Sequence, residues 1–142
     1  MKTASWVILA VIGTLIVVGS LGSAWLAYGG TDYPIGSKPL AEIAAAHEGV
    51  GPAMRGIRGT SAAYGVAYGV LFLAITLGPY RRREVWAWWA ILGGAAAVAI
   101  VTALRVPTLG VALGVQAPLL QLAVVVVGLV MDVARLRPAA DR

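Results

Sequence analysis

The chain has 142 residues, of which 60% are hydrophobic and 12% charged, and its formal net charge is +5. A soluble domain carries about 25% charged residues, so this composition excludes an ordinary water-exposed surface. It predicts a membrane protein built from helices or a closed barrel, which satisfy their own backbone hydrogen bonds. Because the apolar runs are about twenty residues long, the length that crosses roughly 30 Å of hydrocarbon, helices are favoured. The absence of cysteine excludes disulfides and thiolate chemistry.

Four apolar runs predict four transmembrane helices, over about residues 4–28, 60–79, 85–104 and 108–131. Aromatic side chains near their ends are typical of the membrane interface. The alternative for the first run is a signal peptide, because Gly22-Ser23-Ala24 resembles a cleavage site, but this run is longer than a usual signal core. We therefore predict an all-α fold, an integral membrane four-helix bundle that forms one domain over residues 1–142.

The one long loop is predicted over residues 29–59, where the sequence becomes polar and contains three prolines. Within this loop, Pro39–Glu48 is predicted to form a short helix on the membrane surface, with Ser37 as its N-cap. Pro52 suits a first helical turn, so the second helix is expected to be able to begin there, above the hydrocarbon.

The basic residues predict the orientation of the chain. Four spans put both termini on one side, with seven of the eleven lysines and arginines, against four on the other side. The positive-inside rule then predicts termini in the cytoplasm and an outward-facing 29–59 loop. We interpret Arg81-Arg82-Arg83 as a topology determinant that also attracts anionic lipid. Since the positive charge flanks the spans, no nucleic-acid partner is predicted. The predicted location of the chain is the inner membrane of a bacterium.

Two glycine pairs predict close helix packing. Gly65-x-x-x-Gly69 and Gly110-x-x-x-Gly114 each put small residues on one helix face, where helices in lipid approach closely. We interpret both pairs as contacts within the bundle, with dimerisation as the alternative. Arg55 and Arg58 extend the face of the first pair, whereas Tyr64 points nearly the opposite way.

The fourth predicted span contains Pro118, which lacks an amide N–H and crowds the preceding turn, so a kink is expected. Gln116 and Gln121 lie beside it, and an unpaired amide in hydrocarbon is costly. We interpret Gln121 as the source of an interhelical hydrogen bond. The alternative is a polar contact with a ligand bound between the helices.

Charged residues gather at the predicted outer ends of the helices, namely Glu42, His47 and Glu48 from the loop and Arg55, Arg58 and Arg105 from the helix ends. Their charges are expected to pair, either to tie the loop over the bundle or to hold the head of an amphiphile. A single histidine beside a carboxylate does not make a metal site, since a divalent ion needs about four ligands. The candidate ligand-binding residues are therefore His47, Glu48, Arg55, Arg58, Arg105, Gln116, Gln121, Tyr64 and Tyr68.

Several chemistries are excluded by the sequence. It contains no glycine-rich phosphate loop and no Ser-His-Asp set. Because it has a single histidine, it cannot bind a haem between two histidine ligands. Transporters of the small multidrug resistance type rely on an acid in their first span, which this chain lacks. Catalytic residues and cofactors are left unassigned, and no metal is predicted.

The segment from Gly78 to Trp89, with its arginine triplet and three tryptophans, resembles the hinge between helices two and three in many small bacterial membrane proteins. With the long loop after the first helix, the architecture is similar to the broad DoxX-like group of four-helix proteins. That resemblance implies a four-helix fold and a link to respiratory or redox membrane complexes.

The leading functional hypothesis is a non-catalytic accessory or assembly subunit of a membrane complex. The alternative is a protein that binds a lipid or a lipophilic small molecule, or a small membrane enzyme, with its site at the outer end of the bundle. A small transporter ranks below both. The expected partners are the lipid bilayer, a lipophilic ligand, and a second membrane protein or further copies of this chain.

Overall fold

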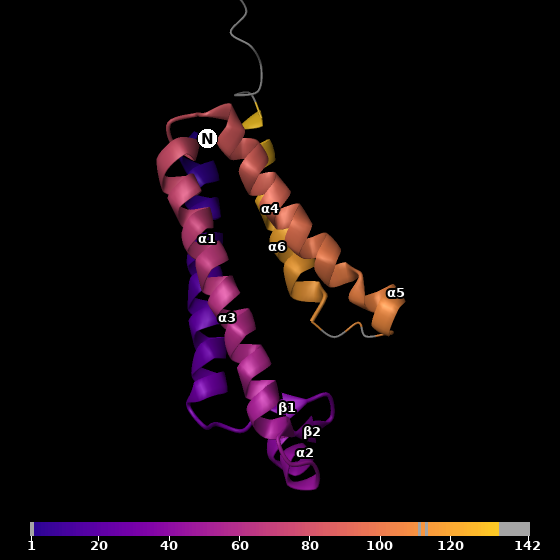
Figure 1. Ribbon diagram of the computed structural model, residues 1–142. Coiled ribbons are helices and arrows are strands. Elements are labelled where there is room, and N and C mark those ends of the chain that lie inside the picture. Colours follow the sequence, from indigo (N-terminus) through magenta and orange to yellow (C-terminus); the bar gives the residue numbers. More distant parts are fainter. Residues whose placement is uncertain (1, 111, 113, 134–142) are drawn as a thin grey trace, which may run out of the picture. The chain divides into compact units, whose positions relative to one another are not determined.

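A computed structural model describes residues 2–110, 112 and 114–133. The elements, in chain order, are α1 (Lys2–Tyr28), β1 (Pro34–Ile35), β2 (Lys38–Pro39), α2 (Leu40–Ala46), α3 (Val50–Ile75), the π-helical turn η1 (Thr76–Tyr80), α4 (Val85–Ala103), α5 (Arg105–Leu109) and α6 (Gln116–Val130) (Figure 1). The described chain is mostly helical, which agrees with the predicted all-α class. Within the described residues, three segments are long and apolar enough to cross a membrane: Ala4–Tyr28, Val50–Tyr80 and Val85–Leu109.

The chain divides into two compact units. Unit 1 combines Met1–Gly13 with Leu71–Arg142, and unit 2 is Thr14–Val70. Helices α1 and α3 therefore each contribute one part to each unit. Helix α3 also begins at Val50, so the last ten residues of the predicted 29–59 loop are helical.

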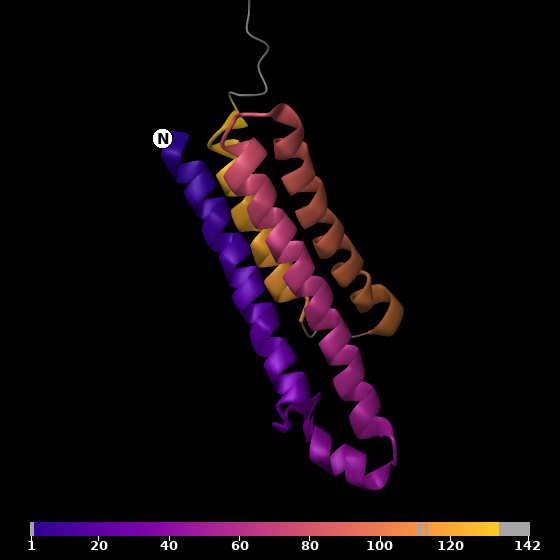
Figure 2. The same ribbon diagram turned by 60° about the vertical axis from the view of Figure 1, so that its left-hand side comes forward.

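In unit 2, α3 packs on α1 through the predicted small-residue face, and the two lie side by side (Figure 2). A Cβ atom added to Gly65 would overlap the Ser20 hydroxyl, and one added to Gly69 would approach Val17 Cγ2 to 2.7 Å. Ala62 on the same face is 4% exposed. The interpretation of this glycine pair as an internal packing contact is thus confirmed.

The connection between α1 and α3 contains a two-stranded hairpin that was not predicted. Ile35 pairs with Lys38 in an antiparallel register, and Gly36 begins the turn with a φ of 64°, which glycine adopts without strain. The predicted short helix is present as α2, but its N-cap residue is Pro39 and no side chain caps it from that position. Asp32 instead accepts the Ala41 N–H at 3.0 Å, so the expected Ser37 cap is wrong.

Unit 1 is built around the pairing of α4 with α6, which lie side by side (Figures 1 and 2). The buried residues of α4 lie on one face and recur about every three to four positions: Ala87, Trp88, Ile91, Ala95 and Ala99. The buried residues of α6 are Val125, Gly128 and Leu129. Small side chains on both helices allow close approach where no water drives association.

Pro79 lies inside η1, where a normal α-helical turn would lose a hydrogen bond and crowd the preceding carbonyl. The wider π turn accommodates it, and the Glu84 N–H donates to the Pro79 carbonyl at 3.1 Å, five residues back. The helical segment that begins at Val50 therefore continues to Tyr80 before the arginine triplet.

The prediction of one helix over 108–131 is wrong. Gly110 and Gly114 have φ values of 65° and 81°, so they form turns rather than a helical packing face. Helix α6 has 15 residues, about 22 Å of helix, which is shorter than roughly 30 Å of hydrocarbon. Pro118 is the third residue of α6, where its missing N–H breaks no intrahelical bond, so the expected kink is also wrong.

Replacing Gly114 by alanine tests the turn before α6. At a φ of 81° a side chain adds strain of about 1 kcal/mol, so Gly114→Ala is expected to lower the free energy of unfolding by that amount. The matched control is Gly93→Ala in α4, where an added Cβ meets nothing within 4 Å and alanine favours the helix. Thermal unfolding in detergent, followed by circular dichroism, separates the two. Equal melting temperatures for both variants would contradict the assignment of this turn.

Candidate functional site

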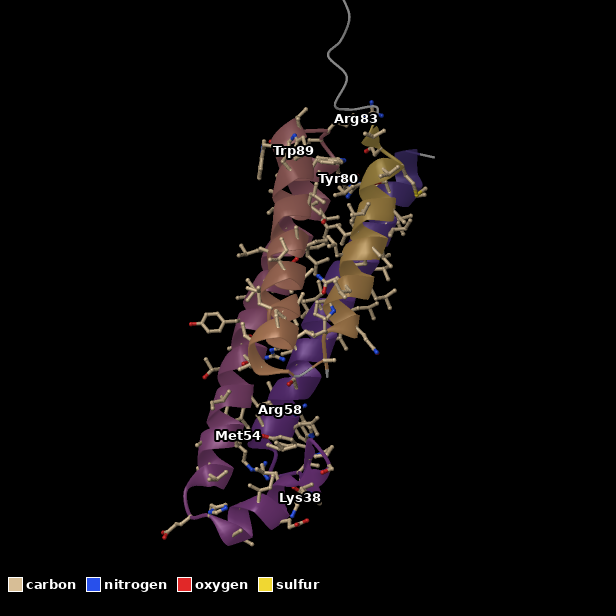
Figure 3. All side chains as sticks on the ribbon, turned by 90° about the vertical axis from the view of Figure 1, so that its right-hand side faces the viewer. Lys38, Met54, Arg58, Tyr80, Arg83 and Trp89 are labelled. Atoms are coloured by element: carbon tan, nitrogen blue, oxygen red, sulfur yellow. The ribbon has the colours of Figure 1, made fainter. Side chains whose placement is uncertain are left out.

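A group of polar side chains in unit 2 surrounds Tyr33, just after α1. We call Asp32, Tyr33, Arg55 and Arg58 the Tyr33 cluster. Tyr33 is only 7% exposed, and the guanidinium carbons of Arg58 and Arg55 lie 4.3 Å and 5.8 Å from its ring centroid. Both arginines come from α3, and Figure 3 labels Arg58. The ring faces thus stabilise two cations through cation–π interactions.

Arg55 caps the end of α1. Its guanidinium donates to the carbonyls of Leu26, Ala27 and Gly30, each at 3.4 Å. The last carbonyls of a helix have no partner within it, and the helix dipole favours a cation there. The donors of Arg55 are therefore committed to holding α1 against α3.

Asp32 is committed to the backbone in the same way. Its Oδ1 atom accepts the N–H groups of Tyr33 and Ala41, both at 3.0 Å. These two bonds fix the start of the hairpin and the start of α2 relative to each other. The carboxylate forms no ion pair with either arginine of the cluster among the described residues.

Arg58 has no such commitment. Its side chain is partly buried, and among the described residues no oxygen accepts a hydrogen bond from it. Its Nε atom and the hydroxyl oxygen of Tyr33 are both buried without a hydrogen-bond partner. Burying such groups unpaired costs free energy, and no described residue supplies an acceptor for either of them.

The predicted pairing of the loop acids with the helix-end arginines is wrong. Glu42 in α2 pairs instead with Lys38 in β2, four residues earlier in the chain, at the hairpin end of unit 2 where Figure 3 labels Lys38. Glu48 and His47 are exposed just after α2. Within the described residues, no group of three or more acids and histidines could hold a metal ion. Local sequence distance explains this outcome, since Lys38 is nearer to Glu42 along the chain than any arginine.

The remaining predicted site residues do not join the cluster as a set. Tyr64 is 74% exposed on α3, and Tyr68 is partly buried in the same unit. Arg105, Gln116 and Gln121 belong to unit 1, where Gln121 Nε2 is buried without a partner among the described residues. Sequence reasoning missed Tyr33. The available signal was an aromatic residue beside an acid, before Pro34, in the predicted 29–59 loop that was also expected to hold both arginines.

The buried polar groups of unit 1 connect its helices. Ser5 Oγ donates its single hydroxyl proton to the Gly128 carbonyl at 2.7 Å. In the second hydrogen bond of Ser5, at 2.5 Å, the Tyr80 hydroxyl is therefore the donor and Ser5 Oγ the acceptor. Trp88 Nε1 donates to the Leu129 carbonyl at 3.1 Å. Both carbonyls lie in the last turn of α6, which needs partners from outside the helix. These residues therefore serve packing, and the Tyr33 cluster is the better candidate for a binding site.

Comparison with known proteins adds no relative to this picture. No protein-family model, curated protein or solved structure matches the chain. The resemblance to DoxX-like proteins therefore stays a prediction, and function is inferred from the Tyr33 cluster.

Proposed function

We propose that the chain is a multi-pass protein of a bacterial cytoplasmic membrane that binds the polar head of an amphiphile at the Tyr33 cluster. One observation carries the proposal: Arg58 is a partly buried cation with no acceptor among the described residues. A guanidinium offers five N–H donors, which an anionic head group satisfies directly. The amphiphile's tail would lie along the apolar helices.

The level of the cluster supports this proposal. Trp25 and Tyr28 are 73% and 72% exposed near the end of α1, as expected for aromatic side chains at a membrane interface. Trp6 and Trp25 are 19 residues apart, about 28 Å of helix, which matches the hydrocarbon thickness. Arg55 reaches the carbonyls just beyond Trp25. The Tyr33 cluster would then lie at the level of the lipid head groups.

Contacts inside unit 1 support an arrangement in which the start of α1, the arginine triplet and the end of α6 lie at one membrane face. Ser5, near the start of α1, bonds the Gly128 carbonyl near the end of α6. Arg81 stacks over the Trp6 ring at 4.6 Å, which brings the arginine triplet to the same end of the unit. Together with the positive-inside rule, these contacts favour a cytoplasmic location for that end of unit 1.

Native mass spectrometry of the detergent-purified protein tests amphiphile binding. We expect the wild-type chain to retain a lipophilic adduct and Arg58→Gln to lose most of it, because the unpaired guanidinium is its main anchor. Lys38→Gln is the matched control, since it removes an equal charge at an exposed position of the same unit, outside the cluster. Circular dichroism verifies that each variant is folded. Equal adduct retention by wild type and Arg58→Gln, or no adduct in either, would contradict the proposal.

An accessory or assembly role in a membrane complex is the second candidate. It is favoured by unit 1, where the buried hydroxyls and indole described above bind helices together rather than face a reactant. Large apolar residues also remain exposed on α4, among them Trp86 at 53% and Val101 at 67%. Purification in mild detergent should then yield a stoichiometric second protein. A chain that always migrates alone or with its own copies would contradict this role.

A further inference from the structure

Two buried polar atoms of the Tyr33 cluster need the same kind of partner. The Tyr33 hydroxyl oxygen and Arg58 Nε are both without a hydrogen-bond partner, although Tyr33 is 93% buried. Each carries a proton to donate, one from a neutral hydroxyl and one from a cation. An oxyanion accepts both bonds at once, whereas a cation or an apolar group leaves both donors unsatisfied.

The surrounding charges also favour an anion. Two guanidinium groups lie within 5.8 Å of one ring centroid, and no carboxylate forms an ion pair with either among the described residues. Asp32 is engaged by two backbone N–H groups, and Glu42 by Lys38. Because like charges this close repel each other, an anion between them would stabilise the folded cluster.

The positions of the donors discriminate between classes of anion. The Arg58 guanidinium carbon lies over the face of the Tyr33 ring, 4.3 Å from its centroid, whereas the hydroxyl lies in the plane of that ring. A guanidinium fork uses both oxygens of a carboxylate, so a third donor must share one of them, whereas a phosphate monoester has a further oxygen and close to two negative charges. A phosphate is tetrahedral, so two of its oxygens can accept hydrogen bonds from the Arg58 guanidinium. A third oxygen, outside the plane of those two, can accept one from the Tyr33 hydroxyl.

We infer that the ligand of the proposed amphiphile site carries a phosphate, which the Arg58 guanidinium and the Tyr33 hydroxyl hold together. This inference rests on the proposed function. Arg55 acts as a positioning residue, since its donors hold the α1 carbonyls while its charge adds to the field. Two kinds of ligand carry this phosphate group, a lipid with a phosphate head and free inorganic phosphate. A tail distinguishes them, because only a lipid gains from burying apolar surface.

The experiment measures the affinity of the full chain, in an uncharged maltoside detergent, for four probes. The probes are dodecyl phosphate, dodecanoate, dodecanol and inorganic phosphate, and titration calorimetry gives each dissociation constant. We expect dodecyl phosphate to bind at least about tenfold more tightly than dodecanoate, since it gains one charge-assisted hydrogen bond. Dodecanol and inorganic phosphate should each bind more weakly, because each lacks one half of the recognised ligand.

Two variants separate the roles of the cluster residues. Tyr33→Phe keeps the ring under Arg58 and removes the hydroxyl, so it should weaken dodecyl phosphate binding about tenfold and leave dodecanoate unchanged. Arg58→Gln should weaken both anions by about a hundredfold, and the exposed Lys38→Gln should change neither. An unchanged melting temperature in Tyr33→Phe identifies the loss as one of binding rather than folding.

The outcomes separate this inference from the proposed function. Equal affinities for dodecyl phosphate and dodecanoate, or no effect of Tyr33→Phe, would overturn the phosphate assignment and leave an amphiphile site intact. Inorganic phosphate that binds as tightly as dodecyl phosphate would support the phosphate chemistry but overturn the amphiphile. Failure of all four probes to bind would overturn both proposals.

Discussion

Gly69→Leu is expected to disrupt the pairing of α1 with α3 in unit 2 and to lower the free energy of unfolding by about 3 kcal/mol or more. A Cβ at this position already lies 2.7 Å from Val17 Cγ2, 3.1 Å from Ile16 Cγ2 and 3.1 Å from the Val17 backbone nitrogen. A flexible side chain could move away, but a backbone atom inside a continuous helix cannot move without displacing the whole helix. The larger leucine side chain would therefore force the helices apart.

The same substitution at an open glycine is the control for this prediction. A Cβ added to Gly22, on α1 in the same unit, meets nothing within 4 Å, and the residue is exposed. Gly22→Leu should therefore leave stability unchanged or raise it slightly, since leucine favours a helix over glycine. Unfolding by titration with a denaturing detergent, followed by circular dichroism, measures both variants. Equal stability of Gly69→Leu and wild type would show that this glycine contact does not hold the helices together.

Ser5→Ala is expected to destabilise unit 1 by about 2–3 kcal/mol. The variant removes the donor to the Gly128 carbonyl and the acceptor of the Tyr80 hydroxyl, at a side chain that is fully buried. A buried group that loses its hydrogen bond costs about 1–3 kcal/mol. The last turn of α6 should therefore fray first, and its amide hydrogens should exchange faster than those of α4.

Two further variants isolate the Ser5 contact. Ser61→Ala removes an exposed hydroxyl from α3 and should change stability by less than about 0.5 kcal/mol. A double-mutant cycle of Ser5→Ala with Tyr80→Phe should give a coupling free energy of at least about 0.5 kcal/mol, because the two hydroxyls share one hydrogen bond. Strict additivity of the two changes would argue against that bond.

Hydropathy and spacing were sufficient to predict the helical class, the presence of three apolar segments and the packing face of α3, although the second segment begins ten residues before the predicted start. These features depend on local properties, namely apolar length and the 3.6-residue repeat that aligns Gly65 with Gly69. The fourth span failed because hydropathy measures how apolar a segment is and not its backbone conformation. Gly110 and Gly114 have positive φ values inside an apolar run, so they end a helix without any polar residue to mark the break.

The candidate site was predictable only in part. Arg55 and Arg58 stood out as cations beside an apolar run, but their partners depend on how the hairpin returns to α3. The contact of Arg58 with Tyr33 spans 25 residues, and no local pattern encodes it. The bond from Ser5 to Gly128 spans 123 residues. The sequence alone thus determined which segments are apolar and helical. Only the tertiary structure decided which polar groups find a partner among the described residues and which, like Arg58 Nε and the Tyr33 hydroxyl, do not.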